Sequence, residues 1–459
     1  MARGPMGRGP LPMLEPAGSP GVGINRSTDR RIAFGGLLVA AVYLGLATVS
    51  ILLPQALRIG VWAPVHLALA GAATTAIAAL LPFFSAALSI SPPARPAIRI
   101  GGIIGVSAGA LMAIETYANA AGQAIPAAIA GGTFVSGLIL VGLAAFLPIR
   151  SAVGPRRPLV ERSYGLALAN VAVGVTIATL FVGGNLVVGT EWGRLKPAHA
   201  WLNLIGFASL VIVATLLHLA PTIAGSRIRS RASGRIAVLG LALGAPVIAV
   251  GYIANQDLIA RIGALVVLAG AVGVAVHGLA IHFDRSRGLW TTDPGWHRMA
   301  TGSLVLGQIW FGTGLAIAAG RVLAFGVKPE GWSLLLIIGP LVIGGVIQIL
   351  VGAMTHLLPT IGPGDPARHT RQRRLLGRAS TIRLGAVNVG AALVTLGFGP
   401  GLSVGLNAGE AAQGGLLVGL GLGCAAVGLV ATLALFAAVA RPRQALVLID
   451  YGASPTPRV

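Results

Sequence analysis

The chain has very little cysteine and very little charge. Cys424 is the only cysteine in 459 residues, which excludes an intramolecular disulfide, a cysteine-rich metal site and a c-type haem attachment within the chain. Charged residues make up 10% of the sequence, against about one quarter in soluble domains. Catalytic triads, P-loops and Rossmann fingerprints are missing as well. The sequence leaves open whether the chain is an enzyme.

What the chain has in abundance is apolar sequence, at 55% of residues with a mean hydropathy of +0.86. A helix needs about 20 apolar residues to cross a hydrocarbon core. The pattern predicts an all-α polytopic membrane protein, with a disordered tail over 1–32, a membrane domain over 33–440 and a second tail over 441–459. The twelve expected spans are 33–54, 60–88, 99–121, 124–148, 164–189, 197–222, 235–254, 258–281, 298–319, 332–359, 382–404 and 412–440.

The net charge of +21 is distributed unevenly over the loops. Of the 33 basic residues, 27 lie in the two tails and in every second loop. The positive-inside rule therefore predicts a cell inner or plasma membrane protein with both termini in the cytoplasm. This distribution favours contact with anionic lipid head groups of the bilayer over nucleic acid. It leaves open whether other membrane subunits bind.

One phrase occurs twice at the end of a long apolar run. Residues 218–223 read HLAPTI and residues 356–361 read HLLPTI, 138 positions later. Each phrase follows a glycine by twelve residues, Gly206 in the first copy and Gly344 in the second. A weaker copy surrounds Gly71, 135 positions before Gly206. Such periodicity predicts an internal structural repeat.

Twelve spans and three copies predict three parallel four-helix pseudo-repeats, with the phrase on the second helix of each. An arginine begins the third helix of each repeat, at Arg99, Arg235 and Arg383. These arginines follow the repeated glycines by 28, 29 and 39 residues. Secondary transporters are commonly built from two six-helix halves, so the count of three disfavours that class.

Two stretches resemble a known family. Residues 198–207 (AHAWLNLIGF) and 65–77 (VHLALAGAATTAI) are similar to phrases of the haem-copper oxidase subunit I superfamily, including NnrS-type and actinobacterial copper-oxidase-like membrane proteins. The resemblance implies twelve helices in a pseudo-three-fold ring, with haem or copper ligands on the second, sixth and tenth helices. It covers most of the membrane region.

The family places histidine at two depths of the repeated helix, and this chain departs from that pattern. The missing histidine in the tenth helix, where Gly339 stands, argues against a bis-histidine haem, and no adjacent histidine pair is available for copper on the seventh helix. Haem-copper oxygen reduction by the familial mechanism is therefore not expected. The outer positions, five residues before each repeated glycine, hold His66, Trp201 and Gly339. The inner positions, twelve residues after each glycine, hold Phe83, His218 and His356.

Five residues are the candidate cofactor ligands. Intramembrane histidine is rare and commonly functional, and imidazole is a frequent ligand for metals and haem iron. We expect His66 to bind metal or haem and to lie near His199, with Glu115 orienting its ring. His218 and His356 are expected at similar depth as a metal-ligand pair. The alternatives are a hydrogen-bonded Glu115 and histidines that satisfy carbonyls at helix ends.

The sequence thus favours a haem- or copper-associated membrane protein in redox, nitric oxide or metal handling, as the resemblance implies. Two alternatives remain open. One is a proton-coupled transporter or permease that uses the histidine and glutamate positions. The other is a non-catalytic structural homologue.

Overall fold

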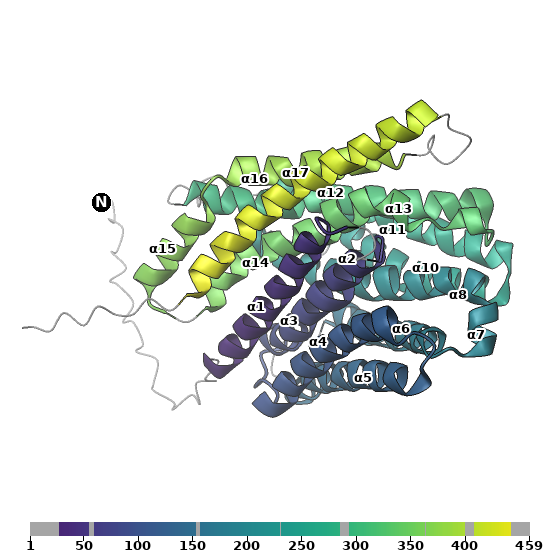
Figure 1. The fold of residues 1–459 in the computed structure, drawn as a ribbon. Helices are drawn as coiled ribbons and strands as arrows, with labels where there is room; N and C mark the ends of the chain where they lie inside the picture. The colour runs from purple at the N-terminus through teal and green to yellow at the C-terminus, as the bar shows by residue number, and fades with distance from the viewer. Residues whose placement is uncertain are drawn as a thin grey trace, which may run out of the picture.

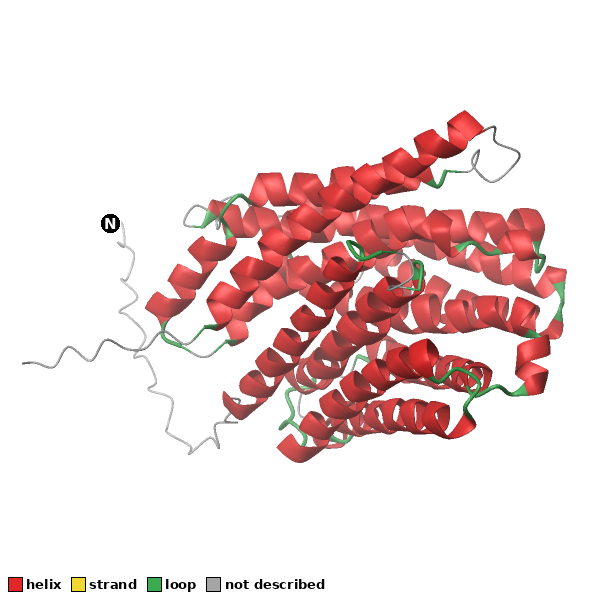
Figure 2. Cartoon of the chain, in the orientation of Figure 1, coloured by secondary structure: helices red, strands yellow, loops and turns green. Residues whose placement is uncertain are grey.

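The computed structural model of the chain is helical throughout its described parts. In these ranges every regular element is a helix, and twelve helices are long and apolar enough to cross a membrane (Figure 2). The prediction of an all-α polytopic membrane protein is confirmed. The structure describes residues 27–54, 59–152, 157–229, 231–284, 293–362, 364–399 and 408–441.

The elements follow one another in three groups along the chain (Figure 1). The first group comprises α1 (Ser27–Ser50), α2 (Trp62–His66), η1 (Leu67–Ala73), α3 (Thr74–Leu88), α4 (Pro96–Asn119), α5 (Ala124–Phe146) and η2 (Pro148–Ser151). The second comprises α6 (Pro158–Val182), α7 (Leu186–Thr190), α8 (Trp192–Ala200), η3 (Trp201–Ser209), α9 (Leu210–Ala224), α10 (Ala232–Ala254) and α11 (Asp257–Phe283). The third comprises α12 (Pro294–Phe325), η4 (Pro329–Gly331), α13 (Leu334–Ile337), η5 (Ile338–Ile347), α14 (Gln348–Ile361), α15 (Pro366–Leu376), α16 (Ser380–Gly397) and α17 (Ala408–Ala440).

The first helix begins earlier than the sequence predicts. Residues 27–32 were expected in a disordered tail, and they form the first turns of α1. The reason is a buried ion pair at the start of the bundle, where Arg99 of α4 donates to Asp29 of α1. A buried charge requires a partner, so this polar turn belongs to the packed structure. Residues 1–26 and 442–459 of the expected tails lie outside the described residues.

The second membrane helix of each group is interrupted by a π-helical segment at the repeated glycine. Gly71 lies in η1, Gly206 in η3 and Gly344 in η5. Thr74 and Ser209, each three residues after its glycine, donate to the carbonyl five residues back. Such π segments are rare and frequently occur at functional sites. The repeat in the sequence is therefore also a repeat in helix geometry.

These three interrupted helices form the centre of the bundle. Within their most apolar windows, between 72% and 89% of residues are buried, against 22% to 61% in the other membrane-spanning helices that the structure describes. The segment η1 packs against both η3 and η5. Each repeated glycine faces a large side chain from the first helix of its own group, so that a Cβ there would collide with it. These side chains are Tyr43 at Gly71, Asn170 at Gly206 and Trp310 at Gly344.

The third and fourth membrane helices of each group form a closely packed hairpin. These pairs are α4 with α5, α10 with α11, and α16 with α17. Small residues permit such close approach in a membrane, and one glycine pair lies at the centre of each hairpin. A Cβ on Gly105 would lie 2.7 Å from the Cα of Gly137. The glycine pairs are Gly105 with Gly137, Gly240 with Gly270, and Gly390 with Gly421.

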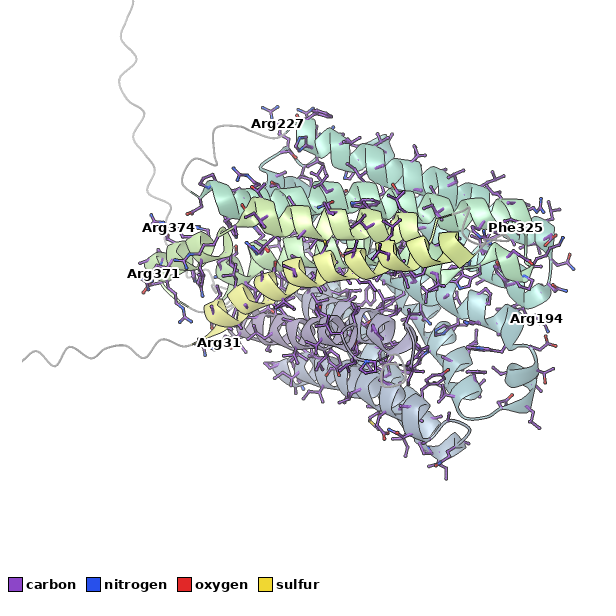
Figure 3. All side chains as sticks on the ribbon, turned by 45° about the horizontal axis from the view of Figure 1, so that its top comes forward. Arg31, Arg194, Arg227, Phe325, Arg371 and Arg374 are labelled. Carbon is purple, nitrogen blue, oxygen red and sulfur yellow. The ribbon has the colours of Figure 1, made fainter. Side chains whose placement is uncertain are left out.

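The bundle has two chemically different ends. Arg31, Arg227, Arg371 and Arg374 lie toward one end, and Arg194 lies at the opposite end with Phe325 (Figure 3). We refer to these as the arginine-rich end and the arginine-poor end. The helix α15, which the sequence analysis did not anticipate, lies at the arginine-rich end. Its eleven residues account for the longer interval between Gly344 and Arg383.

Candidate functional site

His66 lies at the arginine-poor end, at the last residue of α2 and directly before η1. Its Nδ1 lies 2.8 Å from the backbone carbonyl of Trp62, one turn earlier. The imidazole stacks on the Trp62 indole, with ring centroids 4.0 Å apart, and Trp62 stacks in turn on Tyr117 of α4 at 4.1 Å. The ring is thereby held by one hydrogen bond and one aromatic neighbour.

His199 lies in the second group, near the end of α8 and two residues before η3, which begins at Trp201, the repeat equivalent of His66. Its Nδ1 lies 2.9 Å from the carbonyl of Gly174 on α6 and 2.8 Å from the amide nitrogen of Asn203. Gly174 has no side chain, and a Cβ there would collide with Asn203. The close approach of α6 and α8 at this glycine therefore sets the orientation of the imidazole.

The structure places His66 and His199 in the same part of the bundle. Both rings are half-buried, and the π segments η1 and η3 that follow them in the chain contact each other. A carbonyl can only accept, so we assign the proton of each ring to Nδ1. At His199 this assignment also turns the Asn203 amide so that its oxygen, otherwise buried without a partner, faces Nδ1 in place of the nitrogen. The Nε2 atoms then carry the lone pairs. This is the form that a metal-bound histidine takes, with its other nitrogen donating to a carbonyl.

The Nε2 atoms of His66 and His199 have almost no hydrogen-bond partners among the residues that the structure describes. No hydrogen bond to Nε2 of His66 is formed there, and Nε2 of His199 has only a 3.5 Å contact with the Asn203 amide. That distance is too long for a strong hydrogen bond. Both lone pairs are thus available for a ligand.

Glu115 does not contribute to this site, so the expectation that it orients His66 is wrong. Its side chain is exposed and accepts a hydrogen bond from Asn119 at 3.2 Å. Successive residues of a helix turn by about 100°, so a helix that directs Tyr117 toward Trp62 directs Glu115 away from it. The carbonyl of Trp62 takes the role expected of the carboxylate.

His218 and His356 occupy equivalent places in the repeat, and the structure does not bring them together as a ligand pair. Their local structure is nearly identical, since Thr222 donates to the His218 carbonyl at 2.7 Å and Thr360 to the His356 carbonyl at 2.6 Å. His218, however, lies near Arg157 of the region before α6, whereas His356 stacks on Trp296 at 5.1 Å. The surroundings of the two histidines differ because α9 packs against α6 and α10, whereas α14 packs against α1 and α15, although both helices contact α12.

The described residues contain no group of three or more histidine, cysteine, aspartate or glutamate side chains arranged to hold a metal. The familial bis-histidine haem arrangement also does not fit. At Gly339, where the family has its second histidine, a Cβ would collide with Thr395 and with the carbonyl of Ala391 on α16. The site that remains is the pair of imidazoles, His66 and His199.

A second polar cluster, at the arginine-rich end, was missed by the sequence analysis. The Trp296 indole lies between His297, at 4.6 Å, and His356, at 5.1 Å. Its Nε1 donates to the Thr355 carbonyl at 2.6 Å, and Arg373 of α15 pairs with Asp293 at 3.0 Å. Nothing in the spacing of these residues indicates that α15 returns to the start of α12.

Several buried polar side chains of the bundle have no described hydrogen-bond partner, among them His277 and Gln348. Nothing in the sequence connects these two with a site. Both ring nitrogens of His277 are buried without a hydrogen bond, and so are both amide atoms of Gln348. Buried polar groups are normally satisfied. Gln348 follows its repeated glycine by four residues, and Thr75, whose hydroxyl is also buried without a partner, follows Gly71 by the same interval.

Comparison with known proteins does not place the chain in a family. No protein-family model matches it, and no curated protein sequence does.

Proposed function

We propose that the chain is a metal-handling or redox protein of the membrane, in which His66 and His199 together bind a copper ion. The observation that carries this proposal is the shared state of the two rings. Each Nδ1 is directed at a backbone carbonyl, of Trp62 or of Gly174, and each Nε2 is left with a lone pair. Imidazole suits copper and iron among the transition metals.

Copper is preferred here to haem because of what surrounds the pair. A haem held in the familial way needs a ligand from the tenth helix, and Thr395 and Ala391 occupy the space at Gly339. A single ion needs no such space. Bound between the two imidazoles, copper would supply one-electron redox chemistry and a position for a small ligand such as nitric oxide.

The residues of the chain have distinct tasks in this proposal. The Nε2 atoms of His66 and His199 bind the ion, the carbonyls of Trp62 and Gly174 hold the rings, and Trp62 with Tyr117 covers one face of His66. The positive-inside rule orients the arginine-poor end, and hence the site, toward the outside of the cell membrane, with both termini in the cytoplasm.

Metal analysis of the purified full-length protein tests the proposal. The protein is expressed with copper and haem precursor in excess, and its copper content and absorption spectrum are measured. We expect one copper ion per chain, lost in His66→Ala and in His199→Ala and retained in His369→Ala. His369 is a matched control because it lies on α15, at the other end of the bundle, and its ring also contacts a backbone carbonyl. Its Nε2 lies 3.2 Å from the Gly362 carbonyl.

Two results would contradict the proposal. Protein free of copper and haem under these conditions would favour a transporter or a non-catalytic homologue, which uptake assays on the His66 variant would separate. Copper that His369→Ala removes as effectively as His66→Ala would indicate adventitious binding.

A further inference from the structure

The helix α15 is fixed to the arginine-rich end by one of its faces. Gln372 donates to the Val439 carbonyl at the end of α17, at 3.3 Å, and Leu376 is fully buried. Arg373 lies over the Trp296 ring and pairs with Asp293. These contacts leave the opposite face of α15, with Arg371 and Arg374, exposed (Figure 3).

A groove of about 650 Å³ lies between this exposed face and the end of α17. The lining is mostly basic, with three apolar side chains. These are Leu375 from α15 and Ala438 and Val439 from the end of α17. The guanidinium groups that line the groove are those of Arg368, Arg371, Arg374, Arg378 and Arg441.

The charge of the groove is not neutralised by the described part of the protein. Of the ion pairs formed there, none includes any of these five arginines. Asp365 is the single carboxylate in the lining, and it already caps α15 by accepting from the Arg368 backbone amide at 2.6 Å. The groove therefore presents several unpaired positive charges to an anion.

The groove is preformed, because Arg383 connects the segment that ends α15 with α17. Arg383 of α16 is buried and donates to the carbonyls of Leu376 and Arg378 on one side. On the other side it donates to the Thr432 hydroxyl of α17 at 3.1 Å. A ligand would bind here without first ordering the backbone of α15 against α17, which lowers the entropic cost of binding.

We propose that this groove binds the head group of an anionic phospholipid. Phosphate matches the guanidinium groups in charge and hydrogen-bonding geometry. Ala438 and Val439 lie in the last turn of a membrane-spanning helix, and the outer surface of α17 continues with exposed apolar side chains such as Val427 and Val430. An acyl chain can follow that surface, which a soluble anion would not use. Basic pockets at the cytoplasmic ends of membrane helices bind such lipids.

Native mass spectrometry of the full-length protein tests this proposal independently of any metal. The protein is titrated with phosphatidylglycerol or cardiolipin and, separately, with phosphatidylcholine of the same acyl chains. The variant Arg371→Gln/Arg374→Gln is compared with Arg227→Gln/Arg229→Gln, a control that removes two exposed arginines from the same end outside the groove.

We expect the groove variant to bind the anionic lipid about thirty-fold more weakly, since each basic residue near a membrane surface contributes about 1 kcal/mol. The control should bind within about two-fold of the unaltered protein, and Arg371→Lys/Arg374→Lys should retain most of the binding, because charge is kept. Phosphatidylcholine should dissociate from all four proteins equally.

Three results would overturn the proposal. Equal weakening in the groove variant and the control would show a general charge effect. Equal retention of phosphatidylcholine would show that charge is not recognised. Displacement of the lipid by millimolar inorganic phosphate, at concentrations that leave ionic strength unchanged, would show a site for a soluble anion.

Discussion

Each end of the bundle contains a pair of histidines, and the two ends treat the imidazole differently. Only the pair at the arginine-rich end, His218 and His356, is related by the repeat. At the arginine-poor end, Nδ1 of His66 and Nδ1 of His199 each face a backbone carbonyl. At the arginine-rich end, Nδ1 of His218 and Nδ1 of His356 are buried without a described partner. A metal ligand needs one nitrogen oriented and the other available. The hydrogen bond made by the nitrogen that does not bind metal therefore identifies a metal-binding histidine better than the position of that histidine in a repeat.

The largest expected effect separates the two ends directly. In the double variant His66→Ala/His199→Ala, copper binding should be abolished, since both lone pairs are removed. In His218→Ala/His356→Ala, copper per chain should stay within error of the unaltered protein. Metal content of the two purified variants, each checked for a monodisperse elution profile, measures this. Copper loss confined to the second variant would reverse the comparison.

The next effect concerns the third repeat, which has no outer histidine. Gly339→Ala should lower the free energy of unfolding by about 1–3 kcal/mol, the usual cost of overpacking, because the new methyl group would collide with Thr395. Gly132→Ala is the control, since a Cβ there meets nothing within 4 Å. Thermal unfolding in detergent compares the two. An unchanged melting temperature in Gly339→Ala would show that this position could accommodate a ligand.

A smaller effect is expected from the aromatic neighbour of each end. Trp62→Leu keeps the backbone carbonyl that orients His66 and removes the stacked ring, so copper affinity should fall by less than about ten-fold. Trp296→Leu removes the ring that lies against His356 and should leave copper affinity unchanged while it lowers the melting temperature. Competition with a copper chelator gives both affinities. A ten-fold or larger loss in Trp296→Leu would connect the two ends.

The smallest effect is expected at Glu115. Glu115→Gln should change stability by less than about 0.5 kcal/mol, as exposed substitutions usually do, and should leave the copper content unaltered. The exposed side chain keeps its neighbour Asn119 in either form. The same unfolding and metal measurements apply. A loss of copper in this variant would show that the Glu115 carboxylate contributes to the site, and it would contradict the orientation of α4 described above.

The number of membrane spans could be predicted from the sequence, and their ends to within seven residues, because apolar length determines where a helix crosses lipid. The expected span over 258–281 corresponds to α11, Asp257–Phe283. The early start of α1 could not be predicted in this way, since it depends on Arg99, seventy residues away from Asp29. Hydropathy contains no information on a buried ion pair.

The candidate site could be predicted only in part. The spacing from the repeated glycines singled out His66, and the resemblance of residues 198–207 drew attention to His199. The role of Glu115 was misjudged because position along a helix does not give the side that a residue faces. The carbonyls of Trp62 and Gly174 leave no trace in the sequence at all, since every residue has a carbonyl. Their contribution depends on how the helices meet.

The π segment after His66 has a consequence for how this site could be lost or regained. A helix widened in this way contains a surplus residue relative to regular α geometry. Because the widened turn absorbs that residue, deleting one residue from η1 would restore regular geometry and keep the flanking helices in nearly the same rotational register. Deleting one residue from the regular helix α3 would instead rotate everything before it by about 100° relative to everything after it, and His66 would then point elsewhere with its own codon intact. The number of residues between ligand and core, as well as their identity, is part of what selection can act upon here.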